Sequence, residues 1–225
     1  MSELVLPKPY LSYSALDLWL RDPEGYRRRY YLKEPYFSTP YTEFGNIVGG
    51  ALEDRDWEHK VLQPVIDKVP QGTHPEHKIE VTILGVPMLG YLDDFTMENK
   101  AIEEYKTGIR DKKGKAPWDR VKVRKHKQLP LYTLMVKEKY GSWNPEINLT
   151  WMETVWGNTS EEIHFGGNIL RDNTIGLKLT GHVEVFPRTI KEWELDRMAE
   201  IIRKVAEEIS IDYQLWKNKN STSLS

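Results

Sequence analysis

Apolar residues at helical intervals dominate the start of the chain. The segment LSYSALDLWLRDPEGYRRRYYL, residues 11–32, has this spacing in two short stretches. Ser12 or Ser14 can cap the first stretch, and Asp22 before Pro23 is a capping residue followed by a proline at the first helical position. The segment therefore predicts two short helices in succession.

The period then changes from helix to strand. Residues 42–68 keep a helical spacing and predict a third helix, which prolines at positions 70 and 75 end. Residues 78–85 and 86–97 predict two strands joined by a tight turn near Gly85. After the turn ENK, the segment AIEEYKTG at 101–108 predicts a third strand.

The second half of the chain predicts a helix from about 120 to 140 and a fourth strand, INLTWMETVW, at 147–156. Residues 158–187 predict short strands and turns. Thr189 and Glu192 have capping-box spacing at the start of a long final helix. The apolar positions of that helix are Trp193, Met198, Ile202, Val205 and Ile209.

This order of elements favours a mixed sheet flanked by helices, an α/β or α+β fold. The chain has 225 residues, of which 39% are hydrophobic, and this suits one domain with a sizeable core. We expect a single domain over residues 1–225, with its core at about 11–215 and a flexible tail at 218–225.

Composition excludes several classes of site. The chain has no cysteine, which excludes disulfides, thiolate zinc sites and iron–sulfur clusters and is consistent with a reducing, cytoplasmic location. No stretch has the roughly 20 apolar residues of a membrane span, and the first residues do not resemble a signal peptide. The chain lacks the G-x-S-x-G segment that would indicate a serine hydrolase. The formal charge is −2, so an anionic partner requires a local basic patch.

The third predicted strand carries an acid and a lysine on one face. Glu104 and Lys106 are two residues apart, so their side chains project together from a strand. Antiparallel pairing across the turn at 97–100 would bring Asp93 near Glu104. Two carboxylates suit Mg²⁺ with water and phosphate oxygens, and the lysine can orient water and stabilise phosphate charge. The alternative is a solvated acidic turn, above all for Asp94.

These residues resemble the PD-(D/E)XK nuclease superfamily, in the branch of RecB-type nucleases and CRISPR-associated exonucleases. Five segments carry the resemblance and follow the family order. They are LSYSALDLWLRDPEGYRRRYYL, FGNIVGGALE, GYLDDF, IEEYKTG and HKQLPLY. The resemblance implies a restriction-endonuclease-like mixed central sheet flanked by helices. It also implies a Mg²⁺-dependent nuclease, with Mn²⁺ as a substitute. The lack of cysteine separates this chain from the members of the branch that carry an iron–sulfur cluster.

The resemblance also implies roles for single residues. Asp93 and Glu104 would hold the metal together with the carbonyl of Tyr105, and Lys106 would be the catalytic lysine. Gln128 and Tyr132, one helical turn apart, would contact the substrate strand and support the lysine. The alternative for Tyr132 is a core aromatic.

The chain departs from this family where the branch places a histidine metal ligand. Gly49 occupies that position and offers no side chain. Glu53, one turn later, is the candidate replacement, and a site without imidazole favours Mg²⁺ or Mn²⁺. The missing histidine also leaves a second hypothesis open, a catalytically weak DNA-binding or recombination subunit with the same fold.

A basic segment follows the acid-x-lysine strand. Residues 110–127 hold nine lysines and arginines against two aspartates, next to the predicted site. Such a segment suits the phosphate backbone of DNA, and Trp118 in it can stack on an unpaired base or anchor the loop. We expect a nuclease for DNA ends, single strands or flaps, in recombination, repair or replication. The predicted phosphate contacts are Lys112, Lys113, Lys115, Arg120, Lys122 and Arg124. The mode of cleavage and the oligomeric state stay open.

Overall fold

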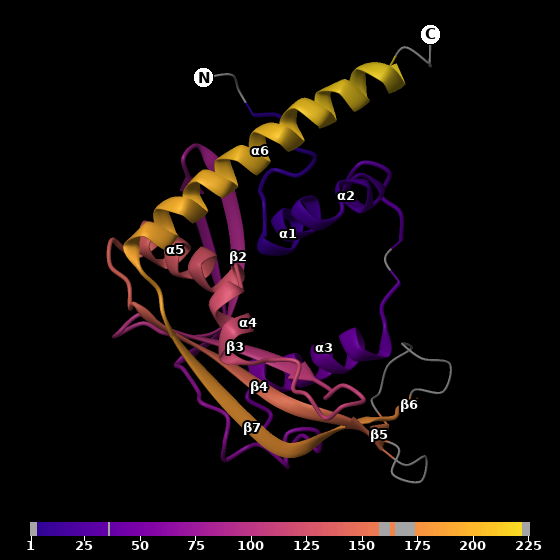
Figure 1. Ribbon diagram of the computed structural model, residues 1–225, viewed down its shortest axis with the longest axis vertical. Coiled ribbons are helices and arrows are strands. Elements are labelled where there is room, and N and C mark those ends of the chain that lie inside the picture. Colours follow the sequence, from indigo (N-terminus) through magenta and orange to yellow (C-terminus); the bar gives the residue numbers. More distant parts are fainter. Residues whose placement is uncertain (1–3, 36, 158–162, 165–173, 222–225) are drawn as a thin grey trace.

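The computed structural model describes residues 4–35, 37–157, 163–164 and 174–221 (Figure 1). The expected mixture of helices and strands is present. In chain order the elements are α1 (Tyr13–Arg21), α2 (Pro23–Tyr30), α3 (Pro40–Glu53), β1 (His74–Ile83), β2 (Val86–Thr96), β3 (Ala101–Gly108), α4 (Arg120–Lys125), α5 (Gln128–Tyr140), β4 (Glu146–Trp156), β5 (Ile163–His164), β6 (Thr174–Ile175), β7 (Leu177–Thr189) and α6 (Glu192–Ser221).

The centre of the molecule is a mixed five-stranded sheet in the order β1-β2-β3-β4-β7. β1, β2 and β3 form an antiparallel meander, β3 and β4 are parallel, and β7 returns antiparallel to β4. Parallel neighbours need a crossover connection, and α4 and α5 supply it between β3 and β4. The predicted α/β fold with a mixed sheet is confirmed.

Helices cover both faces of this sheet. Successive residues of a strand point to opposite faces, and on β4 Trp151 belongs to the larger hydrophobic cluster, whereas Met152 belongs to the smaller one. The larger cluster packs the sheet against α1, α5 and α6, and the smaller one packs it against α3. The two faces therefore have separate cores, and Figure 1 shows α3 apart from α5 and α6.

Two predicted helices have different bounds in the structure. The helix expected over 42–68 ends at Glu53, because Arg55 has a left-handed φ of 54°, and turns follow up to Val69. The helix expected over 120–140 is two helices, with His126 extended between them at ψ 115°. In one continuous helix the ring of Pro130 would clash with the carbonyl of His126, four residues earlier.

The region before the last helix also differs from the prediction. In place of short strands and turns, residues 177–189 form one strand paired with β4, and residues 158–162 and 165–173 lie outside the described part. Thr189 is the last residue of that strand and does not cap α6. The cap-like contact comes from Glu194, whose Oε2 accepts the N–H of Lys191 at 3.0 Å. Trp193 is 57% exposed, although the other predicted apolar positions of α6 are buried.

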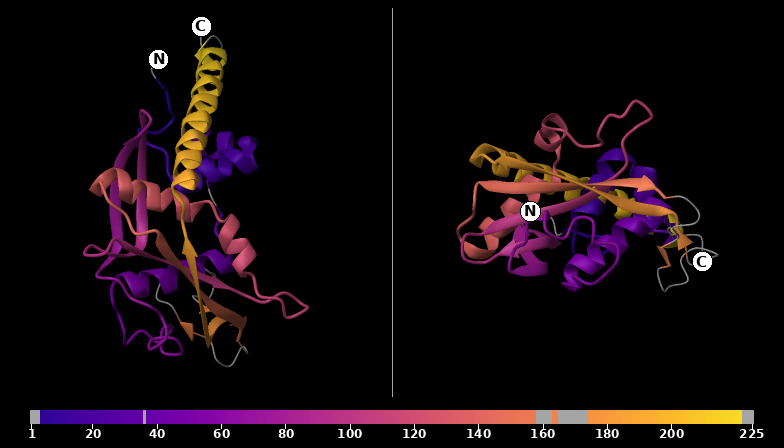
Figure 2. Two further views of the ribbon diagram at one scale, coloured as in Figure 1. Left: turned by 60° about the vertical axis from the view of Figure 1, so that its left-hand side comes forward. Right: turned by 90° about the horizontal axis from the view of Figure 1, so that it is seen from below.

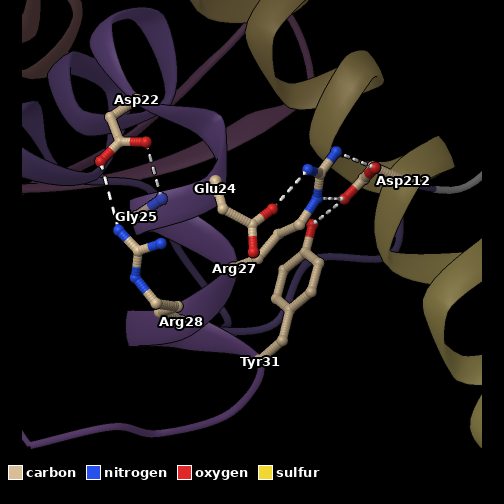
Figure 3. A network of polar contacts seen from close by, with 7 residues as sticks. All are labelled: Asp22, Glu24, Gly25, Arg27, Arg28, Tyr31 and Asp212. Carbon is tan, nitrogen blue, oxygen red and sulfur yellow. Dashed lines mark hydrogen bonds and ion pairs between the residues drawn. The ribbon is translucent and has the colours of Figure 1, made fainter.

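The long C-terminal helix α6 runs past α1 and α2 (Figure 1) and reaches Ser221, so the first four residues of the predicted tail are helical. Arg27 on α2 donates hydrogen bonds of 2.9 and 2.6 Å to Asp212 on α6, and the Tyr31 hydroxyl donates another at 3.0 Å (Figure 3). This network ties the N-terminal helices to the C-terminal one. None of the described helices combines the length and apolar character that crossing a membrane requires.

Candidate active site

The candidate site lies where β2 and β3 separate. Their ladder runs from the pair Thr96–Ala101 to the pair Asp94–Glu103 and ends there. One step further, the carboxylate of Asp93 accepts the backbone N–H of Tyr105 at 2.7 Å. The Asp93 side chain thus takes the place of a backbone acceptor from β2 at this point. The predicted proximity of Asp93 and Glu104 is confirmed.

Glu104 is fully buried and contacts Lys106. Its Oε1 accepts a hydrogen bond from the Lys106 ammonium, while its Oε2 is buried without a hydrogen-bond partner. Burial and the neighbouring Asp93 raise the pKa of Glu104 to about 8, against the opposing effect of Lys106. Burial alone would lower the pKa of Lys106, but Glu104 and Asp93 together raise it. The lysine is therefore a cation that pairs with Glu104 and feels the charge of Asp93.

Asp93 and Lys106 open onto a cavity of about 520 Å³ between α3 and the sheet. Burial raises the pKa of Asp93, although Lys106 and the Tyr105 N–H oppose this. Glu53, the last residue of α3, lines the same cavity, as does Gly49. A Cβ added at Gly49 would meet no atom within 4 Å, so the missing histidine leaves open space that no other side chain fills.

Glu76 is a cavity residue that the sequence analysis missed. It stands opposite Asp93 in the β1–β2 register, where it has a left-handed φ of 46° and no ladder partner. Burial raises the pKa of Glu76, and the charges of Glu53 and Asp93 add to that effect. The only signal in the sequence is a carboxylate just before the strand predicted at 78–85, because the left-handed backbone is visible only in the structure.

Asp94 is buried, so the expectation of a solvated carboxylate at this position is wrong. It is 1% exposed, pairs with Arg55 at 2.8 Å and accepts the N–H of Gly72 at 2.9 Å. The Tyr105 hydroxyl donates to the Pro70 carbonyl at 2.6 Å and to Asp94 at 3.3 Å. Asp94 therefore anchors the turns after α3. It also anchors Tyr105, whose N–H bonds to Asp93.

Gln128 and Tyr132 lie behind the buried glutamate. Gln128 is the first residue of α5, and its side-chain amide lowers the pKa of Glu104, against the larger effect of burial. Burial raises the pKa of Tyr132, and the charge of Glu104 contributes. They are only 8% and 7% exposed, and Tyr132 belongs to the larger core cluster. Both support the site from inside and offer a substrate little surface.

The chemistry of these donors fits a hard divalent cation. The unpaired Oε2 of Glu104 and the adjacent Asp93 are oxygen ligands, and Mg²⁺ needs only one or two carboxylates if water and phosphate oxygens complete its shell. The described residues include no ready-made group of three acidic or histidine ligands. Any metal at this site would thus be held by few protein groups and depend on the substrate for the others.

The basic segment follows β3 as a loop that leads into α4. Figure 2 shows the loop between β3 and α4 projecting from the body of the molecule. The loop lysines and the predicted contacts on α4 are exposed, namely Lys112, Lys113, Lys115, Arg120, Lys122 and Arg124. Arg110 at its base pairs with Glu153 on β4, which fixes the loop to the sheet.

The comparisons with known proteins identify the fold. No protein-family model matches the chain, and none of the curated proteins does. Among solved structures, a candidate exonuclease from Eubacterium rectale has a TM-score of 0.56 at 11% identity, over 89% of this chain and 82% of its own. A phage-related exonuclease from Haemophilus somnus 129PT has a TM-score of 0.51 at 11% identity, over 92% of this chain and 82% of its own. The chain therefore has the fold of these exonuclease structures, as its resemblance to the PD-(D/E)XK nucleases implied.

Proposed function

We propose that this protein is a metal-dependent nuclease that hydrolyses DNA phosphodiester bonds, at ends, single strands or flaps. The observation that carries the proposal is the buried Glu104, bonded to Lys106 on one oxygen and unpaired on the other, beside Asp93 at an open cavity. Burying a carboxylate with an unsatisfied oxygen is costly, and a cation at that oxygen would remove the cost. The exonuclease-like fold supports this assignment.

In this proposal each residue of the site has a separate task. When bound, a divalent cation such as Mg²⁺ supplies positive charge for the phosphate and makes water a better nucleophile. Asp93 and Glu104 provide its carboxylate ligands. Lys106, a cation that pairs with Glu104, stabilises negative charge on the phosphate as the P–O bond breaks and orients the attacking water.

The surroundings hold these groups in position. Tyr105 fixes Asp93 through its N–H and is itself fixed by Asp94 through its hydroxyl. Glu53 and Glu76 add negative charge across the cavity, which raises the local concentration of cations. The exposed lysines at 112–115 then attract the phosphate backbone. We propose a role in DNA recombination, repair or replication.

Incubation of the protein with end-labelled linear and circular single-stranded DNA tests the proposal. Each DNA is mixed with Mg²⁺, Mn²⁺ or a chelator. We expect hydrolysis with either metal and none with the chelator. Loss of linear DNA alone indicates an exonuclease, whereas loss of both indicates an endonuclease. If neither DNA is cut with either metal, the nuclease assignment is wrong, and binding without cleavage would favour the DNA-binding subunit instead.

A further inference from the structure

A second cavity, lined by rings and lysines, lies beside the candidate active site. It has a volume of about 320 Å³, close to the lower end for ligand pockets. We call it the ring–lysine cavity. Its lining residues are Tyr13, Asp17, Trp118, Lys122, Lys125, His126 and Lys127. It lies between α1 and the α4 region. It shares no lining residue with the cavity between α3 and the sheet, which we call the acidic cavity because Glu53, Glu76 and Asp93 line it.

The three rings form a continuous row. The ring centroids of Trp118 and His126 are 5.0 Å apart, and those of His126 and Tyr13 are 5.9 Å apart. Burial lowers the pKa of His126 to about 4, so the imidazole is a neutral ring at neutral pH. All three rings are partly exposed. Partly exposed, neutral rings in a row are surfaces on which a flat heterocycle can stack.

The lysines give this cavity the opposite charge from the acidic one. Lys125 and Lys127 are exposed, and neither has a carboxylate partner within the described part of the chain. The one acidic residue of the lining, Asp17, already accepts a hydrogen bond of 2.9 Å from Arg21. The cavity thus combines stacking surfaces with uncompensated positive charge, as sites for single-stranded nucleic acid do.

Two rings of the row, Tyr13 and His126, lie within electrostatic range of Lys106. Burial raises the pKa of the Tyr13 hydroxyl to about 12, and after Asp17 the next charges that act on it are Lys106 and Glu104. The charge of Lys106 also acts on His126, where it helps to lower the pKa. Lys106 lines the acidic cavity, which suits a metal, and its charge also acts on two rings of the basic, aromatic cavity, which suits a nucleotide.

We propose that the ring–lysine cavity binds an unpaired nucleotide of the substrate, next to the phosphate at which the strand is cut. The base stacks on Trp118, His126 and Tyr13, and its phosphates contact Lys125 and Lys127. A base within a duplex has both faces covered, so the substrate strand must be single at this position. This inference rests on the proposed nuclease function and adds the state of the strand that the site accepts.

Binding without cleavage tests this inference, with chelator present so that no strand is cut. The probes are an oligothymidylate and an abasic deoxyribose-phosphate strand of the same length, which have equal phosphate charge but differ in bases. We expect wild type to prefer the oligothymidylate. Trp118→Ala and Tyr13→Ala should each weaken its binding about 5- to 150-fold and leave the abasic strand unaffected. Trp118→Phe, which keeps a ring, should retain most of the preference.

The lysines should behave differently from the rings. The double variant Lys125→Ala/Lys127→Ala should weaken both probes alike and reduce the salt dependence, because phosphate contacts do not involve the base. Lys139→Ala/Lys204→Ala, which removes two exposed lysines that do not line the cavity, is the matched control and should change neither probe.

Each result separates this inference from the nuclease assignment. If wild type binds both probes equally, or if the ring variants keep the preference for bases, the inference is wrong even when metal-dependent cleavage is observed. If the ring variants bind both probes more weakly and to the same extent, the substitutions have disturbed the loop itself, and the stacking role is again wrong. If wild type binds neither probe and cuts no DNA, the nuclease function itself fails.

Discussion

Asp93 accepts the backbone N–H of Tyr105 at 2.7 Å, at the point where the ladder between their two strands has ended. This bond holds β2 and β3 together through a side chain and leaves the rest of the carboxylate facing the cavity. Glu104 and Lys106 flank Tyr105 in the chain, so this contact fixes the backbone between the two side chains. The cavity therefore opens where the two strands separate, and Asp93 and Lys106 line it while Glu104 is fully buried.

The basic loop gives a prediction about salt. Neutralising Lys112, Lys113 and Lys115 to Ala should weaken binding to all DNA sequences alike, because phosphate contacts carry no sequence information. Each lost contact should reduce the slope of log K against log salt by about 0.7 for a single strand. Fluorescence anisotropy at several salt concentrations measures this slope. A slope equal to that of wild type would mean that these exposed lysines are only solvated surface.

The acidic cavity gives a prediction about metal affinity. Glu53→Gln and Glu76→Gln preserve side-chain shape and remove charge beside Asp93, so each should raise the Mg²⁺ concentration for half-maximal cleavage about 10-fold. Gly49→His has open space for its Cβ and adds an imidazole ligand, so softer metals should support cleavage at lower concentrations than in wild type. Titration curves that superimpose on wild type would place the substituted glutamate outside the metal site.

The buried pair of Arg55 and Asp94 gives a prediction about stability. Arg55→Ala leaves Asp94 uncompensated in the interior and should lower the free energy of unfolding by about 2–3 kcal/mol, less than for a fully buried pair because Arg55 is a quarter exposed. Arg21→Ala breaks an exposed pair with Asp17 and should cost less than about 1 kcal/mol. Urea denaturation of both variants compares them, and equal losses would contradict an anchoring role for Asp94.

The link between α2 and α6 gives a prediction about pH. Hydrogen bonds from Arg27 and Tyr31 depress the pKa of Asp212 in the folded state, against a smaller opposing effect of burial. A depressed carboxyl pKa stabilises the fold above the unfolded value of about 3.9, and this stabilisation is lost as the pH falls through the folded value. Asp212→Asn should be less stable than wild type at pH 7, and the difference should shrink in acid. A difference that does not depend on pH would exclude this linkage.

The sequence predicted the local elements better than their ends. Glu104 was distinguished from its neighbour Glu103 only because it lies two residues before Lys106, and the structure places Glu103 elsewhere, bonded to Asn148 at 2.8 Å. The alternation of a strand is enough for that distinction. The meander of β1, β2 and β3 follows from the same short-range pattern and its turns.

Features that depend on distant contacts were missed. Glu76 joins the site through its register opposite Asp93 and a left-handed backbone, neither of which apolar spacing reveals. Asp94 is buried only because Arg55 and Gly72, remote in sequence, supply its partners. The helix break at His126 was foreseeable, since Pro130 forbids a continuous helix, but the spacing of apolar residues alone concealed it.

The central claim is that Asp93, Glu104 and Lys106 form one metal-dependent hydrolytic site. Its most direct test is the rate of cleavage of end-labelled single-stranded DNA in Mg²⁺ by wild type, Asp93→Asn, Glu104→Gln and Lys106→Ala, with Glu98→Gln on the exposed β2–β3 turn as control. We expect wild type and the control to cut at equal rates, and each site variant to be more than about 100-fold slower while still binding DNA. Cleavage by Lys106→Ala or Asp93→Asn at the wild-type rate would contradict the account.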